Sequence, residues 1–265
     1  MRFRIKLEID KVAYGNILPI NYQYEQSAVI YKLLSSGNEE YATWLHENGF
    51  MLGAKKNFKL FCYSPFKIDK RNRKQIGDRL LILADTIEWQ ISFLPERSTE
   101  EFIKGVFSNQ TFCIGDTKSR VQMRIRSIEA MPEPEFKETM EYSMMSPLFI
   151  KLRKEGERDK YLSPLDDGSE KVLNYSILDK YHSFYGKPYE NVEDVCEFEL
   201  LSEPVKKMRT IKVGTPQESR IIGYNCKLRI TAPVKLHRIM YYAGLGSECS
   251  QGFGCLEIMQ EHKNK

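Results

Sequence analysis

The sequence has no long run of apolar residues. No window of the chain approaches the roughly 18 consecutive apolar side chains that a membrane-spanning helix requires. The N-terminal segment alternates apolar and charged residues, a strand pattern that lacks the apolar stretch of a signal peptide. We therefore expect a cytoplasmic protein that has no membrane partner.

Paired cysteines and metal-binding motifs are also missing. The six cysteines are scattered and none forms a C-x-x-C pair, so buried, reduced thiols are the better interpretation. No D-x-D or H-x-x-x-H run occurs, and the acidic residues between 190 and 203 show no ligand-like order. The sequence therefore predicts no metal and no cofactor, which disfavours a two-metal nuclease.

The net charge of +4 conceals an uneven distribution of charge. Between residues 204 and 238, nine basic residues face one acidic residue, Glu218, so this segment carries +8 and the rest of the chain −4. The nine are Lys206, Lys207, Arg209, Lys212, Arg220, Lys227, Arg229, Lys235 and Arg238. Charge concentrated in this way indicates an anionic partner better than the total does.

The first half of the chain reads as strand, helix, strands, helix, strand. Apolar residues alternate over 3–9 and recur at helical spacing over 26–34. Further elements are expected as a helix over 39–47, a strand over 58–62, a hairpin of 80–83 with 89–93, a helix over 101–108 and a strand over 120–128. Ser98-Thr99-Glu100-Glu101 has the pattern of a capping box for the second long helix. This order fits a β-α-β-β-α-β ferredoxin-like unit.

A proline-containing segment, Met131-Pro132-Glu133-Pro134-Glu135, is the best candidate for a linker. A second round of elements follows it. Strands are expected over 149–153, 160–162, 197–201, 211–213, 220–231 and 252–259, with helices over 170–184 and 235–243. We therefore predict an α+β chain of two tandem ferredoxin-like domains, 1–132 and 133–265, with a glycine-rich loop near the C-terminal end.

That loop is the sharpest local motif. Residues 244–254 have the form G-h-G-x5-G-h-G, where h is apolar, and they lie between a predicted helix and the last strand. The glycines are Gly244, Gly246, Gly252 and Gly254. Glycines permit positive φ angles and allow a polyanion to approach the backbone N–H groups. The alternative is a helix C-cap at Gly244 followed by an ordinary loop and a bulge.

Three N-terminal motifs make the chain recognisable. In order, the sequence contains Asn21-Tyr22-Gln23-Tyr24 with Ile30-Tyr31, then Ala42-Thr43-Trp44-Leu45-His46-Glu47, then Lys59-Leu60-Phe61-Cys62-Tyr63-Ser64. This succession resembles the repeat-processing endoribonucleases of CRISPR systems. The glycine motif resembles the C-terminal signature of their repeat-associated RNA-binding superfamily. The likeness covers nearly the whole chain and is strongest over 1–66 and 204–258.

The resemblance implies a fold, a substrate and a set of site residues. It implies two ferredoxin-like domains and metal-independent cleavage of CRISPR repeat RNA, with pre-crRNA and crRNA as partners. The family's catalytic Tyr, His and Lys fall on Tyr31, His46 and Lys59. An insertion around residues 51–56 leaves Lys55 or Lys56 as substitutes for Lys59. A homodimer and other CRISPR effector-complex subunits are further partners that the resemblance allows.

RNA cleavage by this route needs such residue types independently of any likeness. The 2′-hydroxyl attacks the adjacent phosphate and leaves a 2′,3′-cyclic phosphate and a 5′-hydroxyl. A histidine, with an ordinary pKa of about 6.5, can donate or accept protons near neutrality. A lysine supplies positive charge beside the developing negative charge. A tyrosine is a poor base at neutral pH but a good hydrogen-bond donor.

RNA binding is predicted on two basic surfaces as well as on the glycine loop. The first surface belongs to the second domain and comprises Lys206, Lys207, Arg209, Lys212 and Arg220. The second is the strand end that carries Arg124 and Arg126, with Lys118 and Arg120 beside them. Solvated strand faces are often rich in lysine without binding anything, so this interpretation remains the alternative.

Two rival functions stay open from the sequence. A non-catalytic subunit of the same superfamily would hold guide RNA in an effector complex and would share the glycine loop. An unrelated two-domain RNA-binding module would show no preference for repeats. Each catalytic candidate also has an ordinary structural interpretation: a helical histidine at 46, a core aromatic at 31 and a solvated strand residue at 59.

Overall fold

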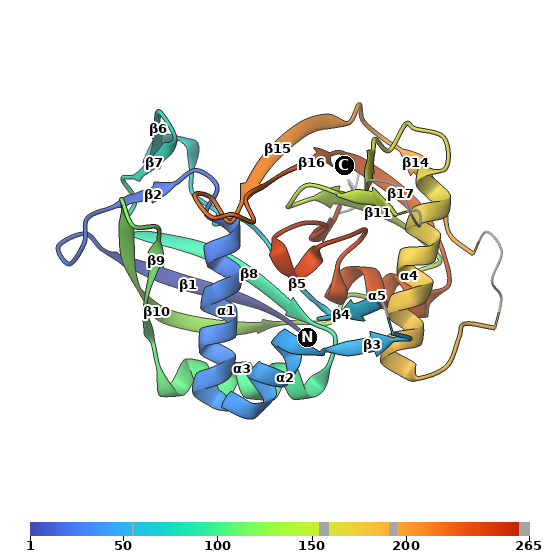
Figure 1. The fold of residues 1–265 in the computed structure, drawn as a ribbon, viewed down its shortest axis with the longest axis horizontal. Coiled ribbons are helices and arrows are strands. Elements are labelled where there is room, and N and C mark those ends of the chain that lie inside the picture. Colours follow the sequence, from blue (N-terminus) through green and yellow to red (C-terminus); the bar gives the residue numbers. More distant parts are fainter. Residues whose placement is uncertain (55, 154–158, 191–194, 260–265) are drawn as a thin grey trace, which may run out of the picture.

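The computed structural model describes residues 1–54, 56–153, 159–190 and 195–259, which form two main β-sheets with helices packed on them and several smaller sheets (Figure 1). The first sheet is antiparallel, with the spatial order β5-β8-β1-β10-β9. Its strands are β1 (Arg2–Asp10), β5 (Phe61–Tyr63), β8 (Thr86–Phe93), β9 (Thr111–Gly115) and β10 (Arg120–Met131). Strand β1 lies between β8 and β10, so the N-terminal segment forms the middle of the sheet.

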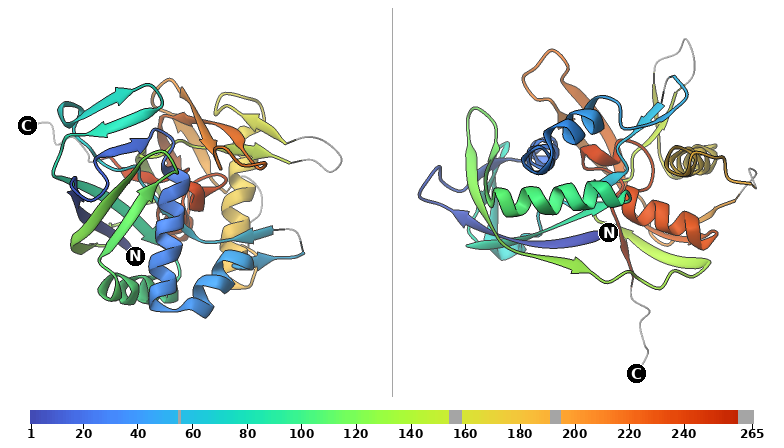
Figure 2. Two further views of the ribbon diagram at one scale, coloured as in Figure 1. Left: turned by 60° about the vertical axis from the view of Figure 1, so that its left-hand side comes forward. Right: turned by 90° about the horizontal axis from the view of Figure 1, so that it is seen from below.

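Helices cover one face of this sheet, as Figure 2 shows. They are α1 (Gln23–Gly37), α2 (Glu39–Glu47) and α3 (Glu96–Ser108). The alternation in β1 explains the packing, because Phe3, Ile5 and Leu7 are all buried in the core beneath the helices. From the helical side, Ile30 and Leu34 of α1 fill the same core.

Two glycines allow α1 and α3 to cross at close range. A Cβ atom placed on Gly105 of α3 would lie 1.7 Å from the carbonyl oxygen of Leu33. A Cβ atom on Gly37 would lie 2.1 Å from the carbonyl oxygen of Glu101. No side chain fits at either position unless the helices separate.

The second sheet has four antiparallel strands in the order β14-β17-β11-β18. They are β11 (Thr139–Met144), β14 (Glu197–Leu200), β17 (Lys227–Thr231) and β18 (Leu256–Ile258), and α4 (Ser169–Tyr185) and α5 (Val234–Ala243) lie on one side of them (Figure 2). In sequence order, the strands β11, β14, β17 and β18 take the same relative places as β1, β5, β8 and β10 in the first sheet. The duplication of pattern seen in the sequence is therefore a duplication of topology.

Smaller elements surround the two sheets. A three-stranded sheet consists of β2 (Ile17–Pro19), β7 (Arg79–Ile82) and β6 (Arg73–Ile76). Three further pairs of strands are β3 (Phe50–Leu52) with β4 (Lys56–Phe58), β12 (Ile150–Leu152) with β13 (Lys160–Leu162), and β15 (Val205–Ile211) with β16 (Ser219–Asn225). The short helices are η1 (Lys70–Asn72) and η2 (Cys249–Gln251). In Figure 1 the β15–β16 hairpin reaches from the second sheet toward the start of α1. Tyr24 of α1 packs there against a small cluster that includes Ile211 and Ile221 of the hairpin.

Each sheet has its own core, and the two cores are tied together. The first core contains residues from Phe3 to Ile125. The second is built from residues beyond 139, with Leu60 and Leu94 added from the first half. Arg2 at the start of β1 is buried and donates hydrogen bonds to the carbonyl oxygens of Tyr241 and Leu256, both at 2.6 Å.

Several local expectations were wrong. The strand expected over 220–231 is two strands, β16 and β17, in different sheets, and the strand expected over 211–213 is absent, because β15 ends at Ile211. Residues 80–83 and 89–93 do not pair with each other: β7 pairs with β2 and β6, whereas β8 fills the place between β1 and β5. The proposed capping box is not a cap, because α3 begins at Glu96, after Pro95. Ser98 lies inside the helix, where its hydroxyl is buried and hydrogen-bonds with the Tyr41 hydroxyl. Within the described residues, no helix is long and apolar enough to cross a membrane.

We predict that Gly105→Ala lowers the free energy of unfolding by about 1–3 kcal/mol, because overpacking at the α1–α3 crossing outweighs the gain of about 1 kcal/mol in helix propensity. Urea unfolding followed by circular dichroism measures this difference. Ser108→Ala, at an exposed position of the same helix, is the control and should stay within about 0.5 kcal/mol. An unchanged midpoint for Gly105→Ala would contradict the close crossing.

Candidate active site

Tyr31 lies on α1 and faces the segment that follows it. Its ring is half-buried and packs against the first core, with its centroid 5.8 Å from that of Phe61. Burial raises the pKa of the Tyr31 hydroxyl well above its ordinary value. At neutral pH this phenol therefore keeps its proton and can act as a donor but not as a base.

His46 lies near the end of α2, with its side chain exposed. Its imidazole meets the Tyr31 ring edge-on, with the centroids 5.0 Å apart and the planes at 83°. Helix α2 is fixed at its start by the Asn38 side chain, which accepts a hydrogen bond from the Tyr41 backbone N–H at 3.0 Å. A capped helix and an aromatic contact thus hold a solvent-facing imidazole in place.

Lys59 completes the group. It lies between β4 and β5, and its Nζ donates a hydrogen bond to the backbone carbonyl oxygen of His46 at 2.7 Å. The next residue, Leu60, has a positive φ of 53°, which is rare for a leucine. Leu60 is buried in the second core. Partial burial lowers the pKa of the Lys59 ammonium, which makes it a stronger acid than an ordinary lysine.

Gly49 makes the approach of Lys59 to His46 possible. It has a φ of 62°, and a Cβ atom there would lie 2.6 Å from the Phe58 carbonyl oxygen and 3.0 Å from Cδ of Lys59. The lysine stem therefore passes directly over the glycine on its way to the end of α2. The sequence reasoning missed Gly49, although a glycine just after a helix is the ordinary signal for a left-handed turn.

The two substitute lysines have different outcomes. Lys55 lies outside the described residues. Lys56 is exposed on β4, and its ammonium pairs with the Asp179 carboxylate of α4 in the second half of the chain. The structure thus brings Tyr31, His46 and Lys59 together, and it turns Lys56 toward a different partner.

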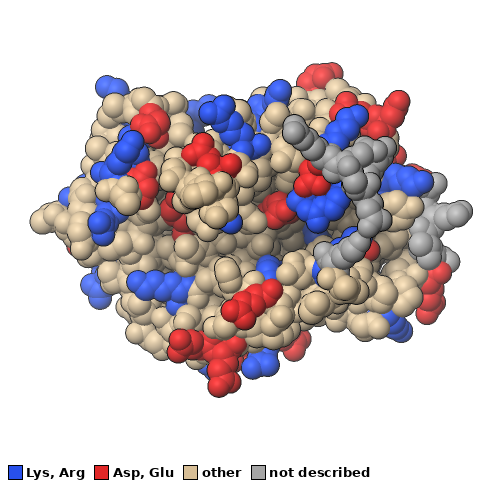
Figure 3. All heavy atoms as spheres, viewed as in Figure 1, with Lys and Arg blue, Asp and Glu red and all other residues tan. Residues whose placement is uncertain are grey.

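The five basic residues of the second half that are predicted to bind RNA lie on the β15–β16 hairpin. Lys206 and Arg220 are exposed, whereas Lys207, Arg209 and Lys212 are half-buried. Burial lowers the pKa of Arg209, and its Nε is buried without a hydrogen-bond partner among the described residues. In Figure 3 basic and acidic side chains are interleaved over this face, which is hollowed near its centre.

Arg124 and Arg126 lie on a different face of the molecule. Both side chains are exposed on β10, where they alternate with Met123 and Ile125 of the first core. They therefore project from the side of the sheet opposite to α1. Arg126 pairs with the Glu8 carboxylate of the neighbouring strand. The two predicted basic surfaces are not continuous with each other.

The glycine-rich loop is buried in the structure. Gly244, Gly246, Gly252 and Gly254 all have positive φ angles and are all buried. The backbone N–H groups of Gly244, Gly252 and Gly254 donate to carbonyl oxygens within the chain. Direct contact of these glycines with RNA stays a prediction, because the described contacts give them a packing role.

The loop packs against α1. A Cβ atom on Gly252 would lie 2.8 Å from Cβ of Gln23, and one on Gly254 would lie 2.0 Å from the Leu245 carbonyl oxygen. The Ser27 hydroxyl of α1 donates a hydrogen bond to the carbonyl oxygen of Ser250 at 2.8 Å. The glycines therefore permit a tight junction between the two halves of the chain.

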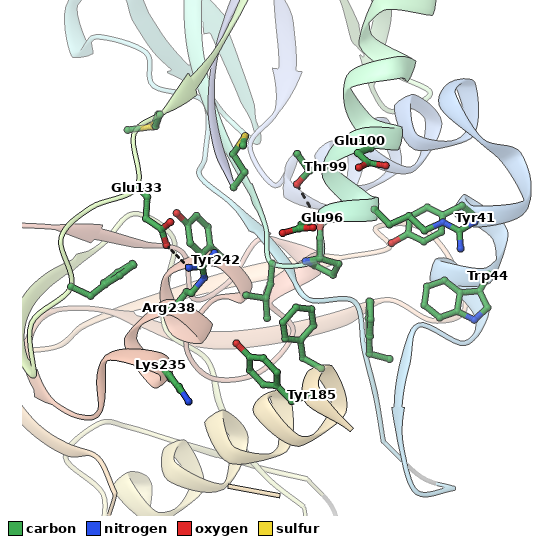
Figure 4. Close-up of a pocket in the computed structure, with 18 of the residues that line it drawn as sticks. Tyr41, Trp44, Glu96, Thr99, Glu100, Glu133, Tyr185, Lys235, Arg238 and Tyr242 are labelled. Carbon is green, nitrogen blue, oxygen red and sulfur yellow. Dashed lines mark hydrogen bonds and ion pairs between the residues drawn. The ribbon is translucent and has the colours of Figure 1, made fainter. Parts of the chain in front are cut away.

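A separate cavity of about 1390 Å³ lies between the halves on the other side of α2. Figure 4 shows Tyr41 and Trp44 of α2 on one side of it and Arg238 and Tyr242 of α5 on the other. None of the three predicted catalytic residues lines it. Trp44 and His46 are two positions apart on α2, about 200° around the helix, so they point in opposite directions.

Comparison with known proteins gives two family matches that together span most of the chain. Residues 17–124 match the model described as CRISPR-associated protein Cas6, N-terminal, and residues 131–258 match CRISPR associated protein Cas6, C-terminal. The CRISPR-associated endoribonuclease Cas6 of Pyrococcus furiosus is 26% identical over 258 residues, covering 97% of this chain and 90% of that protein.

Solved structures share the whole fold. A Cas6-related protein from Pyrococcus furiosus has a TM-score of 0.81 at 24% identity, covering 98% of this chain and 99% of that one. A RAMP protein that binds different RNA substrates has a TM-score of 0.79 at 22% identity, covering 98% of this chain and 100% of that one. The fold is therefore that of the two-domain, α+β CRISPR-associated proteins. The chain belongs to the Cas6 family of CRISPR-associated endoribonucleases.

We predict that Gly49→Ala destabilises the protein by about 1–3 kcal/mol more than Gly53→Ala, because only Gly49 meets neighbouring atoms. Both glycines have a positive φ, 62° and 63°, so both variants share the conformational cost of about 1–2 kcal/mol. Denaturant unfolding of the two variants side by side isolates the contact with Phe58 and Lys59. Equal losses of stability would show that the contact contributes nothing.

Proposed function

We propose that this protein is an endoribonuclease that cleaves CRISPR repeat RNA without a metal ion. The convergence of Tyr31, His46 and Lys59 on one exposed site carries the proposal. The edge-on ring contact of Tyr31 with His46, and the hydrogen bond from Lys59 Nζ to the His46 backbone carbonyl oxygen, bring together residues of α1, α2 and the segment between β4 and β5. Such a constellation is what proton transfer at a phosphodiester requires.

The roles follow from the environment of each side chain. One proton-transfer group takes the proton of the 2′-hydroxyl as its oxygen bonds to phosphorus, and a second gives a proton to the 5′-oxygen as its bond to phosphorus breaks. The exposed imidazole of His46 is suited to either transfer. The Lys59 ammonium, with its lowered pKa, can stabilise the charged phosphorane or supply the second proton. Tyr31, which keeps its proton, orients the imidazole.

RNA would reach this site over the face on which α1 and the β15–β16 hairpin lie. The exposed cations Lys206 and Arg220 and the half-buried Arg209 are placed to contact phosphates beside the start of α1. Arg124 and Arg126 lie on the opposite face of the first sheet, so they would contact the RNA only if it passes around the edge of that sheet. We also infer that both domains are ferredoxin-like, since each sheet has the strand order of a β-α-β-β-α-β unit.

Incubation of the purified protein with a repeat RNA in EDTA tests the proposal. We expect cleavage that leaves a 2′,3′-cyclic phosphate and a 5′-hydroxyl, because the attacking oxygen belongs to the RNA itself. The same RNA with a single 2′-deoxy sugar at the cut should survive. A requirement for a metal ion, or cleavage of the 2′-deoxy substrate, would contradict this mechanism. Tight binding of repeat RNA without any cleavage would instead indicate a guide-RNA-binding subunit.

Substitution of the site residues gives a second prediction. His46→Ala should slow single-turnover cleavage by roughly 10²–10⁴-fold, the ordinary contribution of general acid–base catalysis. Its affinity for the uncleavable RNA should change little, because the imidazole is one contact among many. Comparable losses of cleavage and binding would indicate a folding role.

The lysines provide a matched pair of variants. We expect Lys59→Met to lose most of its cleavage activity, because its ammonium lies at the His46 site. Lys56→Met should cut nearly as well as the wild type, because that ammonium pairs with Asp179. Cleavage rates of both variants at saturating protein compare them directly. The reverse result would assign the catalytic role to Lys56.

A further inference from the structure

A buried lysine lies behind the glycine-rich loop. Lys180 of α4 is 4% exposed, and its Nζ donates to the carbonyl oxygens of Gly244 at 2.7 Å and Gly246 at 2.9 Å. The Cys249 sulfur lies 3.3 Å from the same nitrogen and completes its set of three acceptors. Among the described residues, no carboxylate pairs with this ammonium. Burial of a cation is costly unless its donors are all satisfied, so these acceptors hold a defined arrangement.

The loop that Lys180 holds is the one that packs on α1. Ser176, one turn earlier on α4, also donates to the Gly246 carbonyl oxygen at 3.0 Å. Beyond Cys249, the loop reaches the Ser250 carbonyl oxygen, which accepts the hydrogen bond from Ser27. Ser27 lies one helical turn before Tyr31, on the same helix. A continuous set of contacts therefore runs from Lys180 to the helix that carries Tyr31.

The same part of α4 also contacts the β3–β4 hairpin, which precedes Lys59. Asp179, the residue before Lys180, pairs with Lys56 on β4, and the Phe184 ring lies 6.2 Å from the Phe50 ring on β3. The β3–β4 hairpin leads directly to Lys59. One turn and a half of a helix in the second domain thus contacts both the glycine-rich loop, which packs on α1, and the hairpin that precedes Lys59.

We propose that Lys180 is a positioning residue, which holds the glycine-rich loop against α1 and thereby sets the geometry of Tyr31 relative to His46 and Lys59. This inference rests on the proposed RNA-cleaving function. Lys180 touches neither RNA nor the reacting atoms, so its effect falls on the cleavage step and not on substrate binding. The glycines of the loop then serve its compactness, because a Cβ atom on Gly244 would lie 2.8 Å from Sγ of Cys249 and one on Gly246 would lie 2.5 Å from the Phe149 carbonyl oxygen.

Lys180→Met tests the proposal, since methionine keeps most of the length of the side chain and removes its donors. We expect single-turnover cleavage of repeat RNA to slow by about tenfold or more, since small misplacements of catalytic groups cost up to roughly 10²-fold. The dissociation constant for the 2′-deoxy repeat RNA should stay within about threefold of the wild type. Lys171→Met, at an exposed position of the same helix, is the control and should match the wild type in both measurements.

Hydrogen–deuterium exchange separates this proposal from the proposed function. Lys180→Met should exchange faster than wild type in peptides covering 244–254 and 23–31, and Lys171→Met should not. If the wild type does not cut RNA, the proposed function fails, while the exchange still reports whether Lys180 holds the loop against α1. Wild-type cleavage by Lys180→Met, equal losses of cleavage and binding, or unchanged exchange in 23–31 would each overturn the inference.

A second variant covers the case in which Lys180→Met does not fold. Ser27→Ala removes the hydrogen bond between the loop and α1 and leaves Lys180 in place. It should slow cleavage in the same direction, by a smaller factor, without weakening RNA binding. Cleavage at the wild-type rate by this variant would show that the contact between the loop and α1 does not position Tyr31.

Discussion

The structure depends on a cation buried where its two halves meet. Arg2 starts the central strand of the first sheet, yet its guanidinium donates to carbonyl oxygens of α5 and β18 in the second half and lies 3.6 Å from the centroid of the Tyr241 ring. A third donor, Nε, reaches the Ser92 hydroxyl at 2.7 Å. Because a buried guanidinium without these acceptors would be strongly unfavourable, the two halves cannot shift relative to each other without breaking the two hydrogen bonds to Tyr241 and Leu256.

A fixed junction matters because the candidate site is assembled across it. Tyr31 and His46 belong to helices of the first half, but the conformation of the strands leading to Lys59 depends on the second. Leu60 enters the second core with a strained backbone, and this turn directs the preceding lysine back toward the end of α2. The strain at Leu60 is therefore part of the geometry that places the Lys59 ammonium against the backbone carbonyl oxygen of His46. The packing of Leu60 in the second core therefore helps to fix the position of the Lys59 side chain beside the first domain.

The sequence predicted the overall architecture well, but it predicted the pairing of strands and the contacts of side chains less well. The α+β class and the two-domain arrangement are shown by the family matches, and β1, α1, α2, α4 and α5 fall close to the predicted ranges. The central strand β11 was missed, because Met140, Tyr142 and Met144 alternate too briefly beside a proline-containing linker. The pairing of 80–83 with 89–93 was wrong, since periodicity identifies strands without naming their partners. Lys180 escaped notice because a lysine in a helix is usually solvated, although its spacing from Leu173 and Ile177 places it on the buried face.

The glycine-rich loop illustrates how one motif supports two physical interpretations. Glycine spacing beside a basic segment is what a phosphate-binding loop requires, and it is equally what a tight junction between domains requires. Burial favours the junction for the backbone atoms, since most of the glycine N–H groups already donate within the chain and two of the carbonyl groups face Lys180. A loop fixed in this way can influence RNA cleavage without touching RNA, because it packs against α1 and hydrogen-bonds to Ser27 of that helix.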